Sequence, residues 1–198
     1  MTDLAQLPQP ILDHRPAWID LYWRAWAAFD PSLGWDPTHL ADSLRVSADD
    51  ANLLDRHEAA QVQLDAWCAR FPPPHAPPPD LAPQVAALLL AHVIGVQLSK
   101  VDAPDGHVRQ ILWHLREPVP VGIHNLIWDD YTISLLADHP KGGGLVVNIN
   151  SPVALLLEII TPHTTFVEHV APGPQTLTLT VLDRTDVQTN SGTPSIML

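Results

Sequence analysis

The amino-acid sequence predicts an α+β fold, in which an N-terminal helical region is followed by an antiparallel β-sandwich, and a jelly roll is one form that this sandwich could take. Apolar residues recur at helical spacing up to residue 71 and alternate at strand spacing from residue 92. Between them, the proline-rich segment 72–83 can continue neither a helix nor a sheet. We therefore expect a helical region at 1–71, a linker at 72–83, a sandwich at 84–184 and a flexible tail at 185–198.

The N-terminal region is expected to hold three helices. The first should begin at Pro16, which suits the first helical position, and an aromatic stripe follows from Trp18 to Phe29. A short second helix is expected from Asp36, and a third should follow the capping pattern Ser47-Ala-Asp-Asp50 and end near Arg70. A DNA-binding helix-turn-helix is excluded, because phosphates would repel the acidic third helix.

Short runs of apolar residues, separated by turn residues, follow the proline-rich segment. Residues 94–98 and 111–115 should pair as a hairpin across the turn 102–106. Further strands are expected at 119–128, 131–137, 145–150, 153–161, 164–170 and 175–182. The run 153–160 is apolar on both faces, so it should be a central strand or be covered by the helices.

Composition limits the classes of partner. The formal net charge is −12 and the chain has two lysines, Lys100 and Lys141, which argues against nucleic acid and against an anionic membrane surface. Cys68 is the single cysteine, so no intrachain disulfide is possible. The N-terminus lacks the features of a signal peptide, and the apolar run 85–98 is too short to span a bilayer. A soluble protein of the cytoplasm is expected.

Eleven histidines make a metal site the first chemistry to consider. The motifs H-x-H, H-E-x-x-H and C-x-x-C are absent from the sequence. His163 and His169 would lie about 20 Å apart on one strand, and His107 and His114 would point to opposite faces. We expect no metal and no cofactor. A long-range set remains open as an alternative and comprises His92, His114, His124 and His169.

Motifs for covalent or phosphate chemistry are also absent. The sequence contains no G-x-S-x-G, and Gly142-Gly-Gly144 is not followed by the helix of a phosphate loop. Acid–base catalysis by paired carboxylates remains open, and the candidates are Asp129, Asp130, Glu158 and Glu168. Glu158 lies within an apolar run, so its carboxylate is expected to be paired, to have a raised pKa, or to face solvent at a strand end.

One local resemblance concerns the N-terminal segment. Leu7-Pro-Gln-Pro-Ile-Leu, followed by Pro16-Ala-Trp-Ile-Asp-Leu-Tyr-Trp-Arg-Ala-Trp26, resembles the first helix of trehalase-like glycosidases with a helical toroid. The resemblance covers about twenty residues. The chain is too short for that toroid and its β-rich second half departs from the pattern, so no catalytic residue is carried over.

The sequence favours a non-catalytic structural or interaction protein that acts in a homo-oligomer, because strand edges without lysine or proline invite another chain. A virion or phage-tail component fits this description by analogy of fold class. The alternative is a carbohydrate-binding or carbohydrate-active protein that stacks sugars on exposed tryptophans beside a carboxylate pair. The candidate surface comprises Trp18, Trp23, Trp26, Trp35, Trp113 and Trp128.

Overall fold

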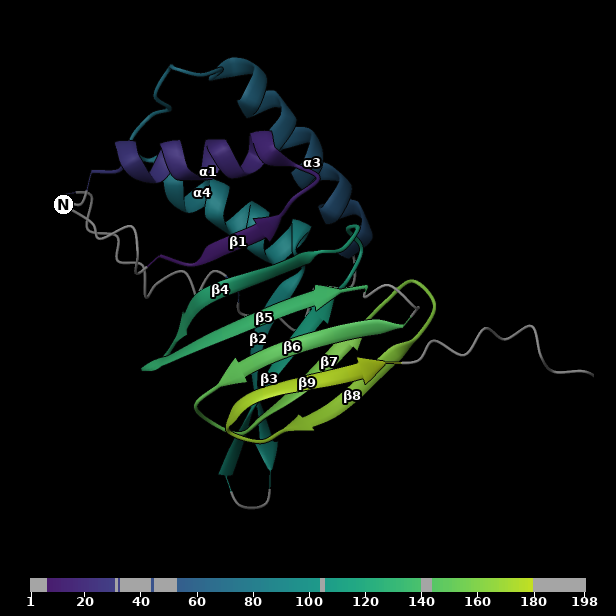
Figure 1. The fold of residues 1–198 in the computed structure, drawn as a ribbon. Coiled ribbons are helices and arrows are strands. Elements are labelled where there is room, and N and C mark those ends of the chain that lie inside the picture. Colours follow the sequence, from purple (N-terminus) through teal and green to yellow (C-terminus); the bar gives the residue numbers. More distant parts are fainter. Residues whose placement is uncertain are drawn as a thin grey trace, which may run out of the picture.

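The computed structural model describes residues 7–30, 32, 44, 53–103, 106–139 and 144–179. Helices gather at one end of the molecule, and the described strands form two sheets that pack face to face (Figure 1). The N-terminal helical region and the β-sandwich that follows it confirm the expected α+β class. The expected helix near Asp36, the capping pattern at 47–50, Trp35 and the tail 185–198 lie outside the described residues.

The helices are α1 (Pro16–Ala28), α3 (Leu53–Arg70), α4 (Leu81–Ala87) and a π-helix, η4 (Leu88–Val93). α1 begins at Pro16 as expected, and its aromatic stripe is buried against α3 and α4. Trp18 Nε1 donates to Asp65 Oδ1 at 2.8 Å, which ties α1 to α3. Within the described ranges, no helix is long and apolar enough to cross a membrane.

The five-stranded sheet has the order β1-β4-β5-β6-β9 and is antiparallel throughout. Its strands are β1 (Gln9–Leu12), β4 (Val121–Trp128), β5 (Tyr131–Asp138), β6 (Leu145–Ser151) and β9 (Gly173–Leu179). β1 is a short strand within the region 1–71, which the sequence predicts to be mainly helical. It belongs to the segment that resembles the first helix of the toroid glycosidases. Its partner β4 lies far along the chain, so local periodicity does not indicate this strand.

The four-stranded sheet has the order β2-β3-β7-β8, from β2 (Val96–Ala103), β3 (Gly106–His114), β7 (Leu155–Ile160) and β8 (Thr165–Val170). β3 and β7 are parallel, which corrects the fully antiparallel expectation. The chain leaves this sheet after β3, builds β4, β5 and β6 in the other sheet, and returns with β7 in the direction of β3. Each hairpin therefore pairs two strands of the same sheet, and this strand order differs from that of a jelly roll.

Side chains from the helices and from both sheets form one apolar core in the described residues. β7 is a central strand, as its two apolar faces predicted. The first hairpin strand begins at Val96, two residues later than expected, because η4 extends the helical path to Val93. Arg24 Nη1 donates to the carbonyls of Phe71 (2.9 Å) and His75 (2.7 Å), so α1 holds the start of the proline-rich segment.

Candidate functional site

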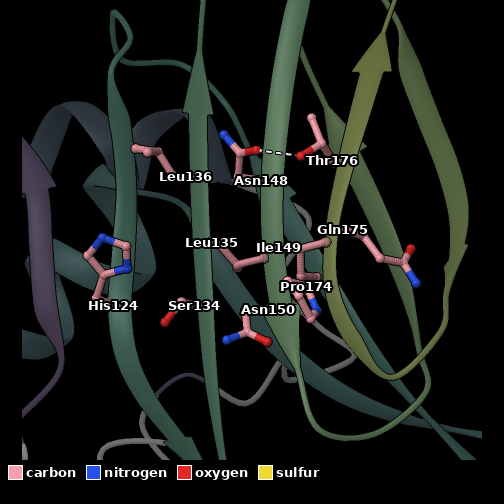
Figure 2. A pocket seen from close by; sticks show the side chains of 10 residues that line it. All are labelled: His124, Ser134, Leu135, Leu136, Asn148, Ile149, Asn150, Pro174, Gln175 and Thr176. Atoms are coloured by element: carbon pink, nitrogen blue, oxygen red, sulfur yellow. Dashed lines mark hydrogen bonds between the residues drawn. The ribbon is translucent and has the colours of Figure 1, made fainter.

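A shallow depression crosses β4, β5, β6 and β9 on the outer face of the five-stranded sheet (Figure 2). Its volume is about 370 Å³. Strand alternation creates it, because Leu135 of β5 points into the core while Ser134 and Leu136 point outward. The outward side chains that line it include His124, Ser134, Leu136, Asn148, Asn150 and Thr176.

A bulge in β4 places His124 at this depression. The regular pairing of β4 with β5 breaks between Ile123 and Leu126, and Asn125 has a φ of 57°. Two residues of β4 therefore oppose one residue of β5, which is the pattern of a β-bulge. The backbone N–H of Asn125 donates to Ser134 Oγ at 3.4 Å. The bulge thereby keeps Ile123 and Leu126 in the core while His124 reaches the outer surface.

The lining combines neutral hydrogen-bonding groups with hydrocarbon surface. Asn148 and Thr176 are partners in the β6–β9 register, and Thr176 Oγ1 donates to Asn148 Oδ1 at 2.8 Å (Figure 2). Within the described part of the chain, the side chains of His124 and Asn150 form no hydrogen bond. None of the ten lining residues is Asp, Glu, Lys or Arg. The depression therefore suits an uncharged ligand with hydroxyl or amide groups.

A buried polar cluster joins the helices to the loop after β3. The Glu117 carboxylate, with 4% of its side chain exposed, accepts from His14 Nε2 at 2.5 Å and forms an ion pair with His57 Nε2 at 3.2 Å. Gln61 Nε2 donates to Oε1 of the same carboxylate. His57 also binds the carbonyl of His92 through Nδ1, at 2.7 Å. The cluster holds α3 and the start of α1 against the sandwich.

The pKa values in this cluster favour its charged form. Burial alone would raise the pKa of Glu117, but hydrogen bonds from His57, His14 and Gln61 together outweigh it and lower the pKa to about 2. The hydrogen bond to Glu117 raises the pKa of His57, although burial acts in the opposite direction. We interpret the cluster as a structural ion pair, since its groups face one another within the protein.

The tryptophans of the expected sugar-stacking surface do not lie together on a surface. Trp18, Trp26, Trp113 and Trp128 lie in the core with exposures of 2%, 2%, 0% and 1%. Trp23 is half-buried and packs against that core. Rings this deeply buried cannot stack on a ligand from solvent, which corrects the expectation for these four. Their aromatic area stabilises the core instead.

The histidines proposed as a long-range metal set are dispersed. His92 and His114 line a cavity of about 10 Å³ beside Gly95, whereas His124 lies on the outer face of the five-stranded sheet. His169 is exposed on β8 of the other sheet. Burial lowers the pKa of His114. In the described ranges, no group of three or more His, Cys, Asp or Glu side chains is placed to hold a metal ion.

The candidate carboxylates are also separated. Glu158 lies on the outer face of β7, half-buried, and accepts from Gln110 Nε2 at 2.9 Å. The β7–β8 register pairs Glu158 with Val167, so Glu168 next along β8 points to the opposite face. Of the environments expected for Glu158, the structure shows an outward-facing, half-buried carboxylate that is hydrogen-bonded to a neutral amide.

Asp129 and its exposed neighbour Asp130 form the turn between β4 and β5. Asp129 forms ion pairs with Lys100 Nζ at 3.0 Å and with Arg109 Nη2 at 3.2 Å. The hydrogen bond from Lys100, followed by that from Arg109, lowers the pKa of Asp129, although partial burial opposes them. Because Lys100 and Arg109 belong to β2 and β3, this carboxylate links the two sheets at the end of the sandwich.

Sequence reasoning missed both the outer depression and the Glu117 cluster. Glu117 lies in the irregular, proline-containing connection after β3, which shows no periodicity in the sequence. Comparison with protein-family models, with curated proteins and with solved structures found no match for this chain. The function must therefore be inferred from the chemistry of the protein's surfaces.

Proposed function

We propose that this chain is a non-catalytic interaction protein that forms a homodimer through the outer face of its four-stranded sheet. The observation that carries the proposal is a surface with six aliphatic side chains on this sheet, of which Val101 and Val167, on the opposite edge strands β2 and β8, are 42% and 56% exposed. We call this surface the aliphatic face. Its residues are Val101, Val108, Leu112, Leu156, Ile160 and Val167.

An aliphatic outer face is unusual for a sheet with one side in solvent, because outward positions are normally polar. Along β7, Leu155, Leu157 and Ile159 point into the core, yet Leu156 and Ile160 on the other side are also apolar. Helices gather at one end of the sandwich and leave this face open enough for Val167 to be 56% exposed. Burying such surface stabilises a complex by about 25 cal/mol per Å² of apolar area.

The charge of the face favours a second copy of the same chain as its partner. With a net charge of −12, most surfaces of two copies repel each other. Among the described outward side chains of this sheet, Glu158 is the one with a formal charge, with histidines counted as neutral. Glu158 accepts from Gln110, and Gln110 in turn accepts from Ser99 Oγ at 3.0 Å. Two such faces can meet about a two-fold axis with little charge opposition.

Strand β8 supplies an open rim to this face. Its partner among the described strands is β7, so β8 is an edge of the sheet. The segment Thr165–Val170 contains no lysine and no proline, the residues that commonly protect an edge from pairing with another chain. A second copy that covers the aliphatic face would also shield this edge. In a virion or phage tail, the same contact would join neighbouring subunits.

Replacement of Val167 by aspartate tests this proposal, with Val62→Asp as a matched control. Both valines are exposed, at 56% and 69%, but Val62 lies on α3, outside the aliphatic face. We expect V167D to weaken the dimer at least ~10-fold in sedimentation equilibrium, because it introduces a charge into an apolar contact. V62D should dissociate like the unmodified chain. Equal dissociation constants for V167D and V62D would contradict the proposed interface.

A further inference from the structure

We propose that the depression on the outer face of the five-stranded sheet binds an uncharged saccharide. This site lies on the other sheet from the aliphatic face, so it is independent of the proposed dimer. Its volume of about 370 Å³ falls within the range of small-molecule sites.

The ligand must be recognised by side chains. β4, β5 and β6 are interior strands of the sheet, and their backbone N–H and C=O groups are used in pairing with neighbours on both sides. A peptide that adds to a sheet requires free backbone groups at an edge, and of the four strands that line the depression only β9 is an edge among the described strands. Asn148, Asn150 and Ser134 instead present amide and hydroxyl groups, each able to donate and to accept. Saccharide hydroxyls have the same dual character.

Part of the lining is already held in place. The Thr176–Asn148 hydrogen bond fixes the Asn148 amide, leaving its NH₂ group able to donate to a ligand. The bulge of β4 sets the backbone position of His124, and Ser134 Oγ accepts from the Asn125 backbone, so its own O–H remains a donor. Groups that are ordered before binding lose less entropy when a ligand arrives.

The remaining lining is apolar. Leu136 and Pro174 contribute hydrocarbon surface beside the amides (Figure 2). A pyranose ring combines an apolar C–H face with hydroxyl groups at its edge, and this lining offers partners for both. Charge argues against ionic ligands, since the ten lining residues include no Asp, Glu, Lys or Arg and the chain carries a net charge of −12, which repels anions.

The test is a nuclear magnetic resonance titration of the ¹⁵N-labelled full chain with maltohexaose, cellohexaose and mannohexaose, each to about 10 mM, with a heparin hexasaccharide as the charged comparison. We expect at least one neutral hexasaccharide to shift the side-chain amide signals of Asn148 and Asn150 saturably. The heparin fragment should not shift them. Because this readout uses the unmodified chain, it does not depend on how any variant folds.

Two threonines of β9 provide a matched pair of variants. Thr176 lines the depression, whereas Thr178, two residues along the same outward face, does not. We expect Thr176→Ala to weaken saccharide binding about 3- to 10-fold and Thr178→Ala to leave it unchanged. No binding of any neutral hexasaccharide, equal shifts with the heparin fragment, or equal loss in the two variants would overturn the proposal. The dimer is measured by mass, so either proposal can fail without the other.

Discussion

Leu156 and Leu157 are neighbours on β7, yet they point to opposite faces of the four-stranded sheet. Leu157 is fully buried between the sheets, whereas Leu156 lies half-buried on the aliphatic face. We expect Leu157→Ala to reduce the free energy of unfolding by about 2–5 kcal/mol, because it leaves a cavity in the core. Leu156→Ala should cost less than about 1 kcal/mol in urea unfolding at concentrations where the chain is monomeric. Similar losses for the two variants would contradict the assigned strand parity.

Glu117 and His57 predict how stability depends on pH. The Glu117 pKa falls from 4.5 to about 2 on folding, so its contribution is present above pH 4.5 and is lost as the pH falls towards 2. The His57 pKa is raised above 6.5, so its contribution is present below pH 6.5 and is lost as the pH rises through the raised value. The network therefore stabilises the fold most between pH 4.5 and pH 6.5.

Replacement of Glu117 by glutamine tests this dependence. We expect E117Q to lower the free energy of unfolding by about 3 kcal/mol between pH 4.5 and 6.5, with a smaller difference outside this window. Glu168→Gln is the control, because Glu168 is exposed on β8. Urea unfolding across the pH range provides the measurement. A constant difference between E117Q and the unmodified chain at every pH would refute the assigned role of the carboxylate.

At the scale of elements, Gly95 connects η4 to β2 in a way that requires glycine. Its φ is +83°, and a Cβ at this position would lie 2.2 Å from the carbonyl oxygen of His114. Gly173 also has a positive φ, +103°, but a Cβ there would contact nothing within 4 Å. We expect Gly95→Ala to cost at least about 3 kcal/mol, from backbone strain and a backbone clash, and Gly173→Ala about 1 kcal/mol, from strain alone. Thermal unfolding that ranks the two variants equally would be inconsistent with this geometry.

Some strands could be predicted from the sequence and others could not. Alternation located β5, β6 and β8 to within one residue at each end, because each strand carries its own inward and outward pattern. β1 and the parallel β3–β7 pair were missed, since both depend on partners far apart in sequence. The outer depression was missed for the same reason. Alternation indicates which residues of a strand face outward, but not that β6 lies between β5 and β9.

For the whole molecule, the change of apolar period at the proline-rich segment predicted the division between helices and strands. It did not predict how closely the two parts would be joined. Buried residues of α1, α3 and α4 belong to the same core as those of the sheets, and Glu117 of the strand part binds His14 and His57 of the helical part. The sandwich has two chemically distinct surfaces. One is the outer face of the five-stranded sheet, with its polar depression, and the other is the aliphatic face of the four-stranded sheet.

The mass of the intact chain in solution tests the central claim, which is that the aliphatic face joins two copies. The chain has a mass of 21.7 kDa. Light scattering coupled to size exclusion, at about 10 μM protein, should give twice the mass of one chain if the dimer forms with an affinity typical of specific complexes. V167D should move the measured mass towards that of one chain under the same conditions. A mass of one chain for the unmodified protein would contradict the account.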